Sequence, residues 1–184
     1  MRIARKMRNL SGAEINLAQS VFGDSLPDWG RILITDGLGP LPTYDNPYTE
    51  EFSFLYKINV GPEVYPDATI TNRNYDGFGN YDDIFIHEMT HVWQYYHGYW
   101  VILRSLWANT GGAGYDYTPG DAWDDYNVEQ QAHIVEDWYK AGMQPNDVRA
   151  VYVNKIVRPG VGNDLIGKLI INLPVDKLRQ FEAS

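Results

Sequence analysis

Residues 81–97 read YDDIFIHEMTHVWQYYH, and the rest of the chain can be interpreted around this stretch. Largely apolar side chains lead in at 84–86 and lead out at 92–96, which predicts a helix that is buried on most of its sides. In a helix His87 and His91 lie one turn apart on the same face. Two imidazoles in that arrangement can bind a single metal ion, so the stretch predicts a metal site.

Glu88 follows the first histidine directly and lies about 100° around the helix from it. That direction puts the carboxylate beside the predicted metal ion and not on it, where it can act as a base on water bound to the metal. The alternative is a pair of histidines hydrogen-bonded within a core. Two imidazoles and a carboxylate in an apolar environment would then cost free energy, and a bound metal ion removes that cost.

The composition is that of one folded domain. The chain has 184 residues, of which 44% are apolar and 14% aromatic, enough to build a hydrophobic core. Its net charge of −9 argues against a nucleic-acid partner, because phosphate binding requires a basic surface. There are no cysteines, so strong metal ligands must come from histidine and carboxylate side chains.

The two ends of the chain differ in character. We expect a basic N-terminal tail at residues 1–9 and a single domain at residues 10–184. No apolar run follows the basic start, so no signal peptide is predicted. The longest apolar run, at 99–106, contains Arg104 and is too short to cross a bilayer. The sequence therefore predicts a soluble protein with no membrane span.

Helix and strand signals both occur along the chain. Capping residues, helical spacing and glycine or proline stops predict helices at 12–22, 81–97, 99–108, 122–140, 145–153 and 174–181, with Asp121 as a candidate cap of the helix at 122–140. Runs rich in β-branched and aromatic residues predict strands at 31–35, 52–58 and 68–72, with a loop at 36–50 and a short apolar segment at 165–173. The expected fold class is α+β, with a short mixed sheet packed on the helix of residues 81–97 and on further helices.

The predicted strands have different roles. The strand at 31–35 should be central, and the alternation of Phe52, Phe54, Tyr56 and Ile58 predicts an aromatic face that packs inward. The more polar strand at 68–72 is expected at an edge of the sheet, where an extended substrate could add as another strand. An ordinary solvated edge is the alternative.

The predicted metal site needs a third ligand. Catalytic zinc usually has three protein ligands and an open fourth position. Glu129, on the helix predicted at 122–140, is the best candidate, and His133, one turn further along the same face, is its rival. If Glu129 binds the metal, His133 or Asp137 can hydrogen-bond to a ligand imidazole and fix its tautomer. Three other carboxylates stay open as ligands: Asp121, Asp125 and Glu136.

The glycine-rich stretch at 109–120 comes before this helix. Most such loops only connect two elements. This one could also lay the hydroxyl of Tyr115 or Tyr117 over the metal site.

Several blocks of the sequence resemble a known family. HEMTHVWQ at 87–94, NVEQQA at 127–132 and IVED at 134–137 resemble the Vgr-related zinc metallopeptidases, which include domains fused to the C-termini of type VI secretion spike (VgrG) proteins. The opening LSGAEINLAQSVFGD at 10–24 is similar to the start of that family. The likeness covers residues 10–140 in scattered blocks.

The resemblance implies a small zincin-like (gluzincin) metallopeptidase domain of the α+β class. Within it His87, His91 and Glu129 would bind Zn²⁺, and Glu88 would be the general base of a peptide-bond hydrolysis by zinc-activated water. The resemblance also implies an antibacterial toxin that is made in the bacterial cytoplasm, delivered by type VI secretion and active in the periplasm of a rival cell. The expected partners are a protein or peptide substrate, a cognate immunity protein and a secretion spike.

Two other functions remain open at this point. One is a structural or adaptor module of the secretion apparatus that binds zinc without catalysis. An intact Glu88 argues against it, because a closed structural site has no need of a base beside the metal. The other is a peptidase that acts on cell-wall peptides.

Overall fold

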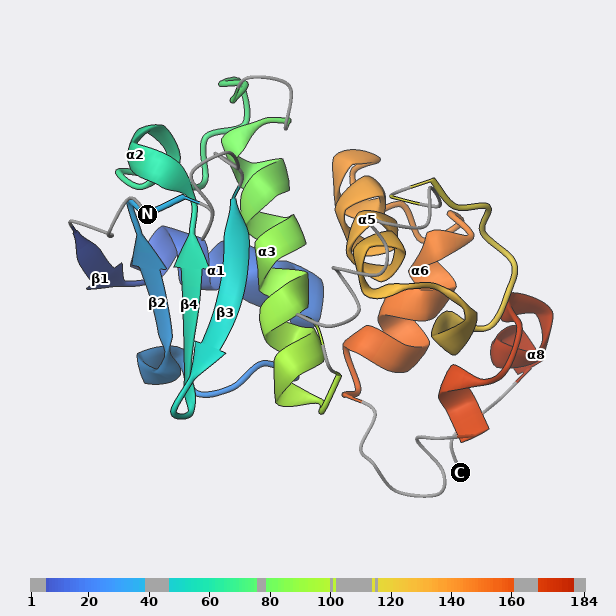
Figure 1. Cartoon of the computed structure of the whole chain (residues 1–184). Coiled ribbons are helices and arrows are strands. Elements are labelled where there is room, and N and C mark those ends of the chain that lie inside the picture. Colours follow the sequence, from blue (N-terminus) through green and yellow to red (C-terminus); the bar gives the residue numbers. More distant parts are fainter. Residues whose placement is uncertain are drawn as a thin grey trace.

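The structure is a computed structural model that describes residues 6–38, 47–75, 79–99, 101, 114, 116–160 and 169–180. A four-stranded sheet lies on one side of helix α3 (Tyr81–Tyr96), and most of the later helices lie on its other side (Figure 1). This arrangement confirms the α+β fold class. None of the helices in the described part of the chain is long and apolar enough to span a bilayer.

The sheet is mixed, with its strands in the order β1-β2-β4-β3. β1 (Met7–Asn9) pairs antiparallel with β2 (Ile32–Thr35), and β2 pairs parallel with β4 (Leu55–Asn59). β3 (Tyr48–Phe52) pairs antiparallel with β4 and is the edge strand that packs against α3. The central position expected for the strand at 31–35 is confirmed by β2, which has a partner on both sides. Met7–Asn9, assigned to the basic tail from the sequence, belongs to this sheet.

The prediction of one strand at 52–58 is wrong, because two strands meet there. The predicted loop at 36–50 is also wrong at its end, where residues 48–50 belong to β3. The chain reverses at Ser53 and Phe54, whose φ angles are 49° and 71°, so Phe52 ends β3 and Leu55 begins β4. Tyr56 and Ile58 point into the core as expected. Phe52 and Phe54 are instead 74% and 78% exposed. The turn lacks the Asn-Gly or Gly signal that usually marks such a reversal.

The polar strand expected at 68–72 is also wrong. The segment is a series of turns, in which the Asp67 carboxylate accepts hydrogen bonds from the backbone N–H and the hydroxyl of Thr69. A local side-chain acceptor of this kind competes with strand pairing. Among the strands of the described residues, the edge of the sheet next to α3 is therefore β3.

The helices begin where their capping residues allow. α1 (Gly12–Phe22) has the predicted capping box of Ser11 and Glu14, and α3 has a second one formed by Asn80 and Asp83. The helix predicted at 122–140 begins later, because Asn127 caps α5 (Val128–Lys140) and residues 123–125 form only a turn of 3-10 helix. Asp121 is not its cap.

The shorter helices complete the fold. They are η1 (Trp29–Arg31), α2 (Gly61–Val64), η2 (Trp123–Asp125), α6 (Arg149–Tyr152), the π-helical turn η3 (Val153–Val157) and α8 (Val175–Gln180). The helix predicted at 99–108 lies largely outside the described residues, and so do residues 165–168 of the predicted apolar segment at 165–173.

The core is built around α3. Phe85, Ile86 and Met89 are fully buried, as expected for a helix enclosed between a sheet and other helices. Trp93 is also fully buried, and its indole N–H donates to the backbone oxygen of Val157 at 2.9 Å. Dense packing of this kind restricts how far side chains on α3 can move.

A partly buried ion pair joins β1 to α1. Arg8 donates from both terminal nitrogens to Glu14, at 2.7 and 2.9 Å, and the same carboxylate accepts the backbone N–H groups of Ser11 and Ala68. Burial alone would raise the pKa of Glu14, but the hydrogen bonds from Arg8 and Ser11 outweigh it and hold that pKa below its ordinary value.

Glu14→Gln should destabilise the fold by about 2 kcal/mol at neutral pH, because Arg8 loses its charged partner. The wild type should also lose stability as pH falls below about 4.5, where Glu14 is protonated in the unfolded chain before it is in the folded one. The variant should lack that contribution. Urea unfolding from pH 7 to pH 3 measures both effects, and parallel pH profiles for the two proteins would contradict this role.

Candidate metal centre

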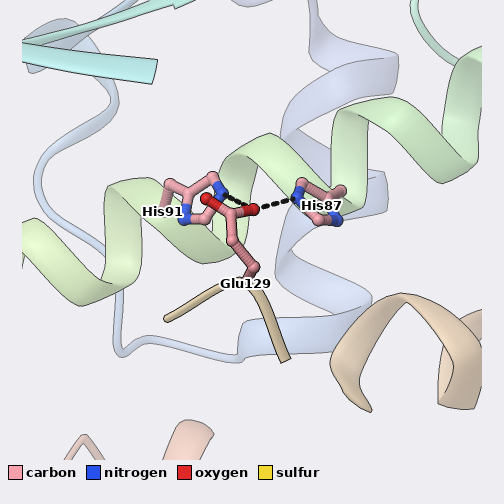
Figure 2. Close-up of side chains that lie close together, drawn as sticks. All are labelled: His87, His91 and Glu129. Carbon is pink, nitrogen blue, oxygen red and sulfur yellow. Dashed lines mark ion pairs between the residues drawn. The ribbon is translucent and has the colours of Figure 1, made fainter. Parts of the chain in front are cut away.

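Two helices bring three predicted ligands together. His87 and His91 project from neighbouring turns of α3, and the Glu129 carboxylate from α5 lies between their rings (Figure 2). Glu129 Oε2 is 3.4 Å from His87 Nε2 and 3.4 Å from His91 Nε2. His91 and Glu129 are buried and His87 is partly buried. The three side chains form a buried group that could hold a metal ion.

The start of α5 explains why Glu129 points at α3. The Asn127 side chain accepts hydrogen bonds from the backbone N–H groups of Glu129 and Gln130, and Gln130 returns one to the backbone of Asn127. This capping box fixes the first turn of α5. A carboxylate in the first turn is also favoured by the helix dipole.

A buried glutamine sets the orientation of His91. Gln94 Oε1 lies 2.7 Å from His91 Nδ1, and Gln94 Nε2 donates to the backbone oxygen of Val128 and to Gln131 Oε1, both at 2.9 Å. Because the amide nitrogen is committed to those two acceptors, Oε1 must accept a hydrogen bond from the N–H at Nδ1. That tautomer leaves Nε2 of His91 free to bind a metal.

A carboxylate does the same for His87. Glu136 Oε2 lies 2.9 Å from His87 Nδ1, so Nε2 of His87 also faces Glu129 as the metal-binding atom. The sequence left the residue that orients a ligand histidine open between His133 and Asp137. The structure instead places Glu136 in that position. Neither Gln94 nor Glu136 was assigned this role from sequence, although Gln94 lies three residues after His91 on the same helix, a spacing at which side chains meet.

The carboxylates and imidazoles of this group shift each other's pKa values. Burial alone would raise the pKa of Glu129, but His91 and His87 outweigh it and place that pKa well below its ordinary value. Burial alone would lower the pKa of His87 and of His91, whereas Glu129 and, for His87, Glu136 raise both. A centre of buried carboxylates and imidazoles is the charge pattern that a bound cation stabilises.

Glu88 lies beside this group. Its side chain is 4% exposed, and Oε2 accepts a hydrogen bond of 2.8 Å from the hydroxyl of Thr49 on β3. Burial raises the pKa of Glu88, while the nearby His91 and His87 and the Thr49 hydrogen bond oppose the increase. Thr49 was not foreseen, since it lies far from the motif in sequence.

A second group of possible ligand atoms comprises His87, His133 and Glu136. The ring of His133 meets that of His87 edge-on at 5.1 Å, and His133 Nε2 lies 3.8 Å from Glu136 Oε2. His87 Nδ1 already forms a hydrogen bond with Glu136 Oε2, so a metal ion bound by this second group would replace the hydrogen bond that orients His87. We therefore interpret His133 and Glu136 as neighbours that support the first group and not as ligands of a second metal ion.

The remaining sequence candidates lie elsewhere. Neither Asp121 nor Asp125 belongs to a potential metal group within the described residues. Asp137 contacts Tyr117, whose hydroxyl donates to it at 2.9 Å, and Arg149 at 3.6 Å. The Tyr117 hydroxyl is therefore engaged with α5, and Tyr115 lies outside the described residues.

Glu136→Ala should weaken zinc binding roughly 10- to 100-fold, because His87 loses the acceptor that fixes its tautomer. Asp137→Ala is the matched control, since it removes a carboxylate from the next position of α5 that has no hydrogen bond to His87 or His91 in the described part of the chain. Competition titration with a zinc-sensitive dye measures both affinities. Equal losses in the two variants would contradict the role given to Glu136.

Comparison with known proteins finds a relative of established name. No known protein-family profile matches the chain. The type VI secretion system spike protein VgrG2b of Pseudomonas aeruginosa is 36% identical over 138 residues, which cover 72% of this chain and 13% of that protein. The chain thus corresponds to a small part of the spike protein.

A solved structure matches the chain over most of the length of both proteins. The effector domain of Pseudomonas aeruginosa VgrG2b superposes with a TM-score of 0.54 and is 31% identical, and the match covers 80% of this chain and 82% of that domain. These values confirm the resemblance to VgrG-related effector domains that residues 87–94 and 127–137 indicated. The chain belongs to the family of the VgrG2b effector domain.

Proposed function

We propose that the chain is a zinc metallopeptidase in which His87, His91 and Glu129 bind the metal and Glu88 is the general base. The observation that carries this proposal is the equal separation of Glu129 Oε2 from the two histidine Nε2 atoms, 3.4 Å in each case. Around a tetrahedral zinc ion with ligand bonds of about 2.1 Å, neighbouring ligand atoms lie about 3.4 Å apart. A direct N–H···O hydrogen bond would be shorter, about 2.9 Å.

The donor set supports zinc. Two imidazole nitrogens and one carboxylate oxygen are a common ligand set of catalytic zinc, which keeps a fourth position for water or substrate. Zinc bound there supplies a Lewis acid that polarises a peptide carbonyl and makes water acidic enough to lose a proton near neutral pH.

The chain's own residues supply the proton transfers and the positioning. Glu88 takes the proton of the attacking water at a carboxylate oxygen and then passes it to the nitrogen of the leaving amine. Its burial raises its pKa, which brings the carboxylate closer to the pH at which it must both accept and donate. Gln94 and Glu136 hold the ligand histidines in the required tautomer.

The sheet supports a peptide as the substrate. β3 is the edge strand beside α3, and its Thr49 side chain touches Glu88. An extended peptide could pair with the open edge of β3 and pass next to the base. From the relationship with VgrG2b we also propose a biological role. The chain would be an antibacterial toxin that type VI secretion delivers into the periplasm of a rival cell, and it would have a cognate immunity protein.

The decisive experiment incubates the zinc-loaded chain with an unfolded protein and, separately, with purified peptidoglycan. Peptide-bond hydrolysis of the protein should occur, should stop when a chelator removes the metal and should return when zinc is restored. Products from peptidoglycan alone would favour the cell-wall alternative. Absence of hydrolysis in both arms, with zinc bound, would contradict catalysis and favour a structural or adaptor module.

A further inference from the structure

Thr49 lies on β3, outside the helical motif, and its hydroxyl contacts Glu88 at two points. Oγ1 lies 2.8 Å from Glu88 Oε2 and 3.1 Å from the backbone oxygen of the same residue. Both side chains are buried, with exposed fractions of 6% and 4%. The carboxylate oxygen is the nearer acceptor and carries charge, so it receives the stronger hydrogen bond.

We propose that Thr49 is the positioning residue for the catalytic base. Its hydroxyl holds Oε2 of Glu88 in place, which leaves Oε1 as the oxygen that takes the proton from water. This proposal rests on the proposed function, in which Glu88 is the general base. Thr49 itself does not touch the reacting atoms and acts through Glu88.

The position of Thr49 makes it a rigid support. It pairs with Ile58 in the β3–β4 register, and Ile58 is fully buried in the core. A β-branched side chain on a paired strand has restricted χ1 freedom. The backbone oxygen of Glu88 lies 3.1 Å from the same hydroxyl, so the single hydroxyl proton is shared between the carboxylate and the α3 main chain. The carboxylate is therefore held by the sheet in addition to its own helix.

A loss of this support should affect the reaction more than the fold. A glutamate side chain has several rotatable bonds, and rates fall by about 100-fold when a reacting group moves by about 1 Å. In the proposed function zinc is bound by other side chains, and a peptide that pairs with β3 uses the main chain of the strand and not the Thr49 hydroxyl. The kinetic signature of a positioning role is thus a lower kcat with little change in KM or in zinc content.

The test compares three variants of the zinc-loaded chain. Thr49→Val keeps the shape of the side chain without its hydroxyl and should reduce kcat roughly 10- to 100-fold. Thr49→Ser restores the hydroxyl and should recover most of that loss. Thr35→Val is the matched control: Thr35 is a buried threonine of the same sheet, and it donates a 2.8 Å hydrogen bond to Asn59 Oδ1. Its loss should lower the urea midpoint without the loss of kcat.

A second measurement does not depend on activity. In the metal-free chain, Thr49→Val should lower the urea midpoint by more in the wild-type background than in a Glu88→Ala background. The hydrogen bond to the carboxylate is present only in the first background, whereas the backbone oxygen of residue 88 is an acceptor in both. Thr49→Ala provides a second variant without the hydroxyl should Thr49→Val not fold.

The outcomes separate the two proposals. If Glu88→Gln abolishes hydrolysis but Thr49→Val keeps the wild-type kcat, the positioning role is overturned and the proposed function remains intact. If the wild type hydrolyses no peptide, the proposed function fails, and the urea comparison still tests the contact. Equal midpoint shifts in the two backgrounds would then overturn the inference.

Discussion

Glu88→Gln should reduce kcat for peptide hydrolysis by on the order of 10³-fold or more while the fold and the bound zinc remain. A positioned general base contributes roughly 10²- to 10⁴-fold to the rate, and an amide cannot accept the proton of water. The amide oxygen of glutamine can still accept the hydrogen bond from Thr49, so the side chain should keep its position. Steady-state kinetics, zinc analysis and circular dichroism of the purified variant measure the three properties.

Glu63→Gln is the control for this change. Glu63 accepts a hydrogen bond of 3.3 Å from the Tyr81 hydroxyl at the start of α3, so the control alters a carboxylate that contacts the same helix. It should have wild-type kcat. Retained hydrolysis by Glu88→Gln would remove Glu88 from the mechanism. Loss of zinc from that variant would instead indicate that Glu88 supports the metal.

Glu129→Ala should weaken zinc binding by more than 100-fold, since it removes a ligand, and loss of a residue that only orients a ligand already costs 10- to 100-fold. The variant should be inactive at stoichiometric zinc. His133→Ala is the informative partner, because the sequence left His133 as the rival third ligand. It should bind one zinc ion with close to wild-type affinity.

The thermal stability of Glu129→Ala distinguishes a catalytic from a structural centre. A structural zinc site supplies folding free energy, so its loss should unfold the chain. Here the core around α3 is extensive, and we expect the variant to remain folded without metal. Zinc loss from His133→Ala with full retention by Glu129→Ala would reverse the two assignments.

The group of His87, His91 and Glu129 could be anticipated because helical geometry fixes the first two and the third required only a facing helix. His87 and His91 are separated by one helical turn, and over one turn the spacing in sequence determines the distance in space. The sequence predicts α5 in nearly the correct place but begins it at residue 122, six residues before Val128. Asn127 is as good a cap as Asp121, and only the packed structure shows which of them begins the helix.

The residues that support the site were harder to anticipate. Thr49 reaches Glu88 from a strand that was assigned partly to a loop, and the contact exists only because the chain reverses at Ser53 and Phe54. The alternation of aromatic residues continues through this turn, so a period-two pattern could not reveal it. The sequence offers Glu136 as a ligand, but its neighbour in the structure is Nδ1 of His87, and that contact depends on how α5 is rotated against α3.

The central claim is that His87, His91 and Glu129 together hold one zinc ion. Crystals of the zinc-supplemented chain, with diffraction measured on both sides of the zinc absorption edge, test it most directly. We expect one strong anomalous peak per chain, within about 2.2 Å of Nε2 of both histidines and of a Glu129 carboxylate oxygen. A peak elsewhere, or no peak at these three side chains, would contradict the account.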